Sequence, residues 1–213
     1  MLNLPSSTEF GRRVPKQKFY EHLDVSPEVK RLFIDQIKLI TWANKLSPQT
    51  MNLGAGQTVT EIEVFHIRLA GQELDKRTLE LMDWQIPYHI LFVLERPDGQ
   101  MQLRISYKEA AQSGDHAFRL RQSYATEFAP PESLTLPLDA LDMDGLYASI
   151  VRAIAGDALA APEQPLEQAV AQAQEKEKLQ RQITQLKAKM KKEKNLGKQM
   201  ELRREIRRLE DRM

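Results

Sequence analysis

The end of the chain carries two series of apolar residues that mirror each other. The first keeps the seven-residue spacing of a coiled coil, and the second resumes it in the reverse direction after Gly197. This seam consists of Leu179, Ile183, Leu186 and Met190, followed by Leu202, Ile206 and Leu209. In one continuous helix the second series would be rotated from the first by about a third of a turn. Reversal of the chain near Leu196 brings the two series face to face, which predicts an antiparallel helical hairpin.

The turn of this hairpin is expected at "KNLG", residues 194–197. Gly197 suits a turn because glycine adopts positive φ at little cost. The same mirror symmetry also fits an antiparallel coiled-coil homodimer centred on Leu196. The break in the seven-residue spacing favours the hairpin, and the homodimer stays open as the alternative.

The tail is basic although the whole chain is nearly neutral. Residues 163–213 contain 14 Lys and Arg against 9 Asp and Glu, and the totals of 31 and 30 leave 17 against 21 in residues 1–162. Basic tails often contact nucleic acid or acidic surfaces, and solvated helix faces are equally common. The candidate nucleic-acid-binding residues of the tail are Lys191, Lys192, Lys194, Lys198, Arg203, Arg204, Arg207 and Arg208.

The rest of the chain alternates between helical and strand patterns. The segment up to Tyr20 contains Pro5 and Pro15 and is predicted to be an extended arm. A helix is expected over 26–46, with Ser26 as N-cap and Pro27 in the first position. A strand over 58–71, a helix over 73–85, a strand over 116–128 and a helix over 146–159 follow from apolar spacing.

Residues 86–108 predict a β-hairpin, because Asp98-Gly99 separates two runs rich in β-branched and aromatic residues. The first run is apolar on both faces, which is typical of a central strand. The second run and the strand over 116–128 place basic residues on one face. The candidate basic sheet face consists of Arg104, Lys108, Arg119 and Arg121.

The predicted fold class is α+β. An antiparallel or mixed β-sheet with flanking helices, expected on one side, forms a body over residues 1–160 together with the N-terminal arm. A proline-containing linker over 161–165 precedes the basic helical hairpin, a coiled coil, over 166–213. Pro162 and Pro165 mark that boundary.

Composition excludes several functions. The chain has no cysteine, so disulfides, thiolate metal sites and cysteine nucleophiles are ruled out. The first 16 residues contain no apolar run of signal-peptide length, and "IPYHILFVL" is too short to span a bilayer. We therefore expect a cytoplasmic protein with no membrane partner.

Few sequence motifs indicate a chemical function. The histidines lack metal-ligand spacing, and His89 is predicted to be a core residue. "LGAGQT" is glycine-rich but has no following lysine, so it is interpreted as a loop and not as a phosphate cradle. A divergent metal-dependent nuclease would need Glu61, Glu63 and Lys108 together, but Ser106 stands where a carboxylate is wanted before the lysine. No catalytic residue, metal or cofactor is assigned.

Several segments together are similar to a known family. They are "LPSSTEFGRRVPKQKFY", "WANKLSPQTMNL", "VTEIEVFHIRL", "IPYHILFVL" with "RISYK", and "KNLGKQMELRREIRRL". In this order the chain resembles the bacterial domain-of-unknown-function family numbered 4391. The family has no agreed activity, so the resemblance transfers no catalytic residues. It implies association with DNA helicases and DNA methyltransferases in restriction-like phage-defence gene clusters.

Three functions follow as expectations. The first is a non-enzymatic adaptor or accessory subunit of a DNA-targeting defence complex, which docks through the hairpin on a helicase or DNA methyltransferase. The second is a nucleic-acid-binding subunit that uses the basic hairpin and the basic sheet face. The third is the divergent nuclease.

Overall fold

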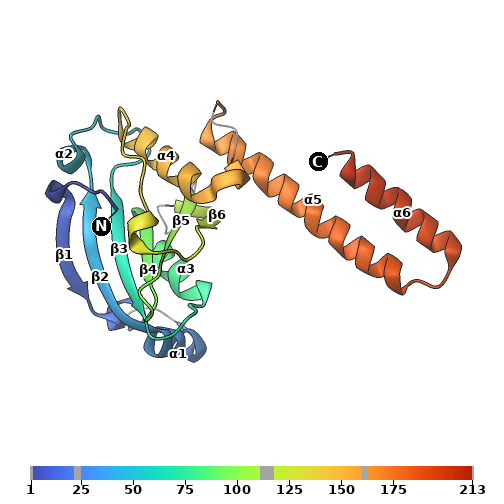
Figure 1. Ribbon diagram of the computed structural model, residues 1–213, viewed down its shortest axis with the longest axis horizontal. Coiled ribbons are helices and arrows are strands. Elements are labelled where there is room, and N and C mark those ends of the chain that lie inside the picture. The colour runs from blue at the N-terminus through green and yellow to red at the C-terminus, as the bar shows by residue number, and fades with distance from the viewer. Residues whose placement is uncertain (1, 22–24, 111–117, 160–162, 213) are drawn as a thin grey trace. The chain divides into compact units, whose positions relative to one another are not determined.

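The computed structural model describes residues 2–21, 25–110, 118–159 and 163–212 (Figure 1). The chain forms two compact units, Met1–Asp157 and Ala158–Met213. The first unit holds the sheet and its helices, and the second holds a helical hairpin.

The sheet of the first unit has six strands within the described residues, arranged in the order of the sequence. The strands are β1 (Glu9–Val14), β2 (Ile37–Leu46), β3 (Ile62–Leu69), β4 (His89–Glu95), β5 (Met101–Ala110) and β6 (Phe118–Ala125). Only β3 and β4 pair in parallel, and the other neighbours are antiparallel. A parallel pair needs a crossover, and helix α3 (Lys76–Gln85) supplies it. The predicted mixed sheet is confirmed.

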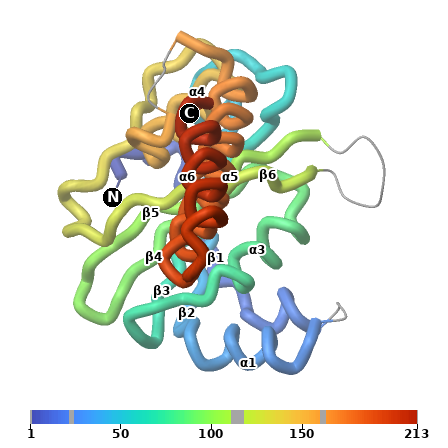
Figure 2. Tube along the Cα trace, turned by 90° about the vertical axis from the view of Figure 1, so that its right-hand side faces the viewer, coloured from blue at the N-terminus to red at the C-terminus, as the bar shows by residue number. Residues whose placement is uncertain are grey.

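Helices pack on both faces of this sheet, so the expectation of helices on one side is wrong. Phe33 of α1 (Pro27–Gln36) and Met82 of α3 belong to one core cluster with Phe92 of β4. His89 has the opposite parity on β4 and contacts Tyr147 of α4 (Met143–Ala155), with ring centroids 4.3 Å apart. Since alternate residues of a strand point to opposite faces, α4 covers the face that α1 and α3 leave open. α1 and α4 lie near opposite ends of the sheet (Figures 1 and 2).

The segment predicted as one helix over 26–46 is half helix and half strand. Ser26 is the N-cap, and its hydroxyl accepts a hydrogen bond from the backbone N–H of Val29 at 3.4 Å. The helix ends at Gln36, where β2 begins. The spacing of Ile37 and Ile40 fits a helix as well as a strand. The segment forms the strand β2 because β1 and β3 pair with it on either side.

The predicted N-terminal arm is part of the body. Its residues Glu9–Val14 form the edge strand β1, and Phe19 is buried in the core. Short helical turns complete the unit. They are η1 (Ser6–Thr8), η2 (Lys16–Phe19), α2 (Pro48–Met51) and η3 (Pro131–Ser133), whereas η4 (Gly156–Leu159) begins in this unit and ends in the second.

The glycine-rich segment before β3 is a loop, as predicted, and the carboxylate of Asp144 organises it. Asp144 accepts hydrogen bonds from the backbone N–H groups of Gln57 at 2.6 Å and Val59 at 2.8 Å, and from the Thr58 hydroxyl at 2.8 Å. These bonds lower the pKa of Asp144, although burial opposes the shift. The loop therefore cradles an anion that the protein itself supplies.

The second unit is the predicted antiparallel hairpin. It consists of α5 (Leu166–Lys192) and α6 (Leu196–Glu210), which pack together along their length (Figure 1). Lys187 pairs with Glu210 at 2.8 Å, and Glu175 pairs with Arg212 at 3.4 Å. The two helices therefore run in opposite directions, as the mirrored apolar series predicts. Among the described residues, none of the helices combines the length and the apolar character needed to cross a membrane.

Candidate functional site

The seam of the hairpin is a narrow core. Leu179, Ile183 and Ile206 are buried. The remaining seam residues, Leu186, Met190, Leu202 and Leu209, are half-buried. Two helices alone cannot enclose a wide core, so the seam residues hold the hairpin together and leave most of its surface to solvent.

The turn between the helices is fixed by hydrogen bonds. Asn195 caps α6 by accepting from the backbone N–H of Lys198 at 3.1 Å. Glu193 accepts from the backbone N–H groups of Asn195 at 2.8 Å and Lys194 at 2.9 Å, which lowers its pKa. Gln199 donates to the carbonyl of Glu193 at 2.6 Å. The turn is therefore formed by residues 193–195, and the prediction that Gly197 belongs to it with a positive φ is wrong, because Gly197 lies in the first turn of α6.

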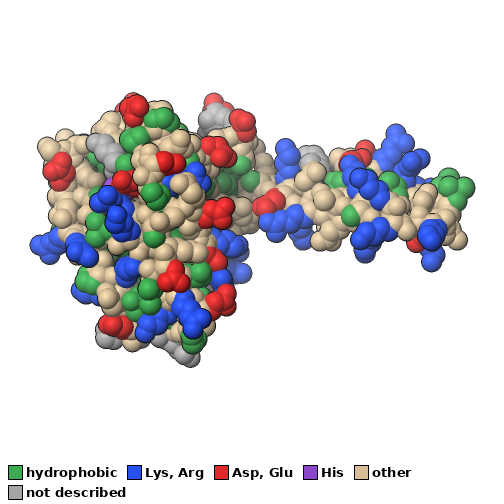
Figure 3. Space-filling view, turned by 60° about the horizontal axis from the view of Figure 1, so that its bottom comes forward, with side chains coloured by type: hydrophobic (Ala, Val, Ile, Leu, Met, Phe, Trp, Pro, Cys, Tyr) green, Lys and Arg blue, Asp and Glu red, His purple; other side chains and the backbone are tan. Residues whose placement is uncertain are grey.

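All eight predicted cations of the hairpin are exposed. Among the described residues, none of their side chains forms an ion pair or a hydrogen bond. Residues 187–212 contain 11 Lys and Arg against 5 Asp and Glu. Figure 3 shows basic side chains along the hairpin, with apolar side chains at its tip. This surface therefore carries a net positive charge, although Lys187 and Arg212 are paired with Glu210 and Glu175.

The tip also exposes two large apolar side chains. Leu196 is 73% exposed and Met200 is 52% exposed. Both lie near the start of α6, shortly after its N-cap residue Asn195. Neither belongs to the seam, so the hairpin core does not account for them. A contiguous apolar patch with a charged rim is a feature of docking surfaces.

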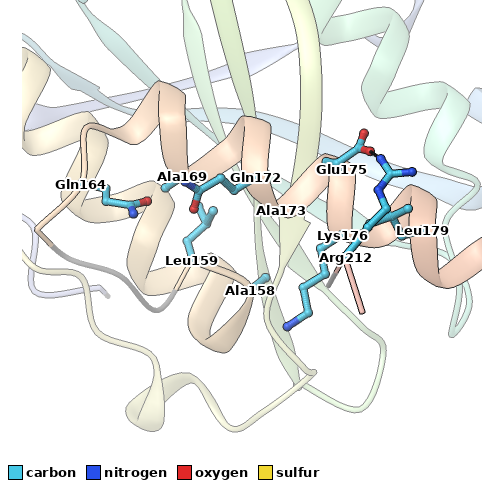
Figure 4. A pocket seen from close by; sticks show the side chains of 10 residues that line it. All are labelled: Ala158, Leu159, Gln164, Ala169, Gln172, Ala173, Glu175, Lys176, Leu179 and Arg212. Carbon is cyan, nitrogen blue, oxygen red and sulfur yellow. Dashed lines mark hydrogen bonds and ion pairs between the residues drawn. The ribbon is translucent and has the colours of Figure 1, made fainter. Parts of the chain in front are cut away.

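A pocket of about 350 Å³ lies within the second unit, where α5 extends beyond the end of α6 (Figure 4). Leu159, Ala169 and Leu179 contribute apolar walls, and the Glu175–Arg212 ion pair lies at its rim. Its lining includes no nucleophile beside a base, so the pocket offers no catalytic arrangement.

The basic sheet face does not assemble as predicted. Lys108 was expected to point to solvent, but it is buried, because α3 covers this face of β5. Arg119 and Arg121 are exposed, and Arg121 is paired with Glu109 at 2.6 Å. Arg104 is half-buried. The four side chains therefore do not form one solvent-facing patch.

Lys108 instead belongs to a buried polar network. Its ammonium lies 2.9 Å from Asp83 Oδ1 and donates to the carbonyls of Asp83 at 3.0 Å and Tyr88 at 2.7 Å. Ser106 donates to Asp83 Oδ2 at 2.5 Å and contacts the hydroxyl of Ser123 at 2.9 Å. Burial raises the pKa of Asp83 and lowers that of Lys108, while their mutual contact opposes both shifts. The network joins α3 to β5, and its two charged side chains, Lys108 and Asp83, are shielded from solvent.

Glu61 and Glu63 are separated from Lys108 and meet Lys45 instead. Lys45 Nζ lies 2.6 Å from Glu61 Oε2, which raises the pKa of Lys45. Trp42 Nε1 donates to Glu63 Oε2 at 2.7 Å. Burial, followed by the interaction with Glu61, raises the pKa of Glu63 to about 7. The trio expected for a nuclease is therefore not assembled with Lys108.

The two histidines of the sheet differ in surroundings. His89 is buried as predicted, and burial lowers its pKa to about 4, with the nearby Lys108 charge adding to the shift. His66 Nε2 lies 2.7 Å from Glu95 Oε2, and burial lowers its pKa despite that carboxylate. His66 thus pairs across to β4 and not with Glu61 or Glu63.

Comparison with known families agrees with the sequence resemblance. The chain matches the family described as "Domain of unknown function (DUF4391)" over residues 2–213. The chain belongs to this family. No curated protein and no solved structure matches it. Membership of DUF4391 therefore relates residues 2–213 to one family but assigns no catalytic residue.

Three residues that form the polar clusters of this DUF4391 chain were not identified from the sequence: Asp83, Trp42 and Lys45. Asp83 lies on a helix, and no local pattern connects it with β5. Trp42 and Lys45 lie on β2, which was assigned to a helix. Correct assignment of β2 as a strand beside β3 would have placed Lys45 opposite Glu63, because these residues are partners in the ladder.

Proposed function

We propose that this DUF4391 protein is a cytoplasmic, non-enzymatic accessory subunit of a DNA-targeting, restriction-like phage-defence complex. It docks through the α5–α6 hairpin on a helicase or DNA methyltransferase. The observation that carries the proposal is the tip, where Leu196 and Met200 are exposed on a turn fixed by the Asn195 cap. The choice of a helicase or DNA methyltransferase as partner rests on the family resemblance, and the cytoplasmic location is an expectation from the sequence.

The energetics of the tip favour a protein partner. Exposed Leu and Met side chains gain free energy when a pocket buries them, by roughly 25 cal/mol per Å² of apolar surface. The surrounding cations favour an acidic rim on the partner and speed association. Because the turn is already ordered by its hydrogen bonds, docking requires little further ordering of the tip.

The test is purification of the tagged full-length chain from its native host after nuclease treatment, with copurifying proteins identified by mass spectrometry. The variant Leu196→Gln with Met200→Gln removes the apolar tip and keeps the helix. Leu141→Gln is the matched control, because Leu141 is an exposed leucine of the other unit at 92% exposure. We expect a helicase or methyltransferase with the wild type and the control, and its loss with the tip variant. Equal recovery with the tip variant contradicts the proposal.

A second candidate function is nucleic-acid binding, and the eight exposed cations of the hairpin favour it. Each phosphate that a cation neutralises releases counterions, so affinity for DNA falls steeply as salt rises. Replacement of Arg203, Arg204, Arg207 and Arg208 by Gln should weaken binding and flatten the salt dependence. Affinity that is independent of salt between 50 and 200 mM would exclude this function.

A further inference from the structure

The start of β3 gathers acidic and basic groups on one face of the sheet. Lys45 and Trp42 are the ladder partners of Glu63 and Phe65, and directly opposed residues share a face. Lys45 and Trp42 are three positions apart, so a regular strand would turn them to opposite faces. The register shift between Trp42 and Asn44, a β-bulge, turns both toward Glu63.

Glu63 is the unusual member of this group. Its side chain is buried, with only 1% of the residue exposed. Trp42 supplies a hydrogen bond to Oε2, but no amide, amine or hydroxyl donor of the described residues reaches Oε1, and the carboxyl group of Glu61 is its neighbour. A buried carboxylate oxygen without a donor is costly, so a cation or a proton is required beside it.

We propose that Glu61 and Glu63 form a binding site for one divalent cation, Mg²⁺ or Mn²⁺. This site goes beyond the docking role of the hairpin and lies in the other unit. Carboxylate oxygens are the ligands that these hard cations prefer, and Mg²⁺ keeps several waters, so two protein carboxylates suffice. Groups of three acidic or histidine ligands are absent from the described residues, so water completes the coordination.

Lys45 supplies the internal counter-charge and the entry path. Its ammonium contacts Glu61 at 2.6 Å, and its side chain is 35% exposed while that of Glu61 is 23% exposed. The flexible lysine can therefore swing into solvent and open the two carboxylates to a cation. Because the ammonium competes with the metal for Glu61, removal of the lysine charge should tighten metal binding.

The test is titration of the full-length chain with Mn²⁺, followed by electron paramagnetic resonance of the free ion. We expect one saturable site in the wild type, and affinity at least about tenfold weaker in Glu61→Gln and in Glu63→Gln, which lose a charged ligand. The variant Lys45→Met should bind more tightly than the wild type. Glu201→Gln on the exposed face of α6 is the control and should bind as the wild type does.

Three results would overturn the proposal. They are the absence of a saturable site in the wild type, unchanged binding in the two glutamine variants, and weaker binding in Lys45→Met. Circular dichroism of each variant without metal establishes that it is folded. The outcome is independent of the partner purification, because the tip variants do not alter the sheet.

Discussion

Lys108 and Asp83 form an ion pair that is shielded from solvent on both sides, with 0% and 1% of the two side chains exposed. The lysine ammonium donates hydrogen bonds to two backbone carbonyls and lies 2.9 Å from one oxygen of the Asp83 carboxylate. One of those carbonyls belongs to Asp83, in the last turn of α3, where a positive charge also complements the helix dipole. The pair fastens the end of α3 to β5.

Removal of the lysine alone should destabilise the first unit strongly. Lys108→Met leaves the Asp83 carboxylate buried without its counter-charge, and we expect a loss of about 3–5 kcal/mol in the free energy of unfolding. The double variant Asp83→Leu with Lys108→Met should recover much of this loss, since no charge stays buried. Urea denaturation followed by tryptophan fluorescence measures both, because Trp42 and Trp84 lie in this unit. Additive losses in the double variant would contradict the coupling.

The difference between predicted and missed features follows from how local each signal is. The hairpin at Asp98-Gly99 was predictable, because Gly99 adopts φ +85° and its N–H reaches the carbonyl of Arg96 within four residues. The α5–α6 hairpin was predictable for a similar reason, since its two apolar series lie on either side of one turn. Neither depends on a distant segment.

The missed features depend on pairing between distant segments. Ile37 and Ile40 fit a helix locally, and only β1 and β3 on either side decide for a strand. Lys108 has the alternation of a solvent-facing residue, and only the placement of α3 over β5 buries it. The Lys45–Glu61 contact depends on a β-bulge that no residue pattern announces.

Gly56 should be required by the loop that encloses Asp144. A Cβ at this position would lie 2.5 Å from the carbonyl oxygen of Val59 and 2.8 Å from Asp144 Oδ1. We therefore expect Gly56→Ala to lower the free energy of unfolding by about 1–3 kcal/mol, as overpacking does. Gly71→Ala is the matched control, because a Cβ there meets no atom within 4 Å. The control should be neutral or slightly stabilising, and equal losses in the two variants would contradict the steric argument.

Stability should fall as pH decreases through the range in which His89 titrates. Burial lowers the pKa of His89 from 6.5 to about 4 in the folded chain, so the unfolded chain binds this proton more tightly. The contribution of neutral His89 to the free energy of unfolding is fully present above about pH 6.5. Acidification toward pH 4 lowers the free energy of unfolding by about 3 kcal/mol through this group. Free energies of unfolding at pH 7 and pH 4.5 measure it.

The variant His89→Phe is the control for this pH dependence. Phenylalanine keeps a ring against Tyr147 and Phe118, which lie 4.3 Å and 4.8 Å from the His89 ring, and it does not titrate. The variant should therefore lose less stability than the wild type between the two pH values. An identical loss in both proteins would assign the pH dependence to other groups.

The hairpin should depend on its seam and not on its exposed tip residues. Ile206 is 5% exposed, and Ile206→Ala should destabilise the hairpin by about 2–4 kcal/mol, because it leaves a cavity between α5 and α6. Leu196→Ala removes a similar side chain that is 73% exposed, and should change stability by less than about 0.5 kcal/mol. Amide hydrogen exchange of the full-length chain reports on each helix separately. We expect faster exchange of α5 and α6 in Ile206→Ala alone. Equal acceleration in Leu196→Ala would show that Leu196 stabilises the hairpin itself. That result would contradict the assignment of Leu196 to partner binding.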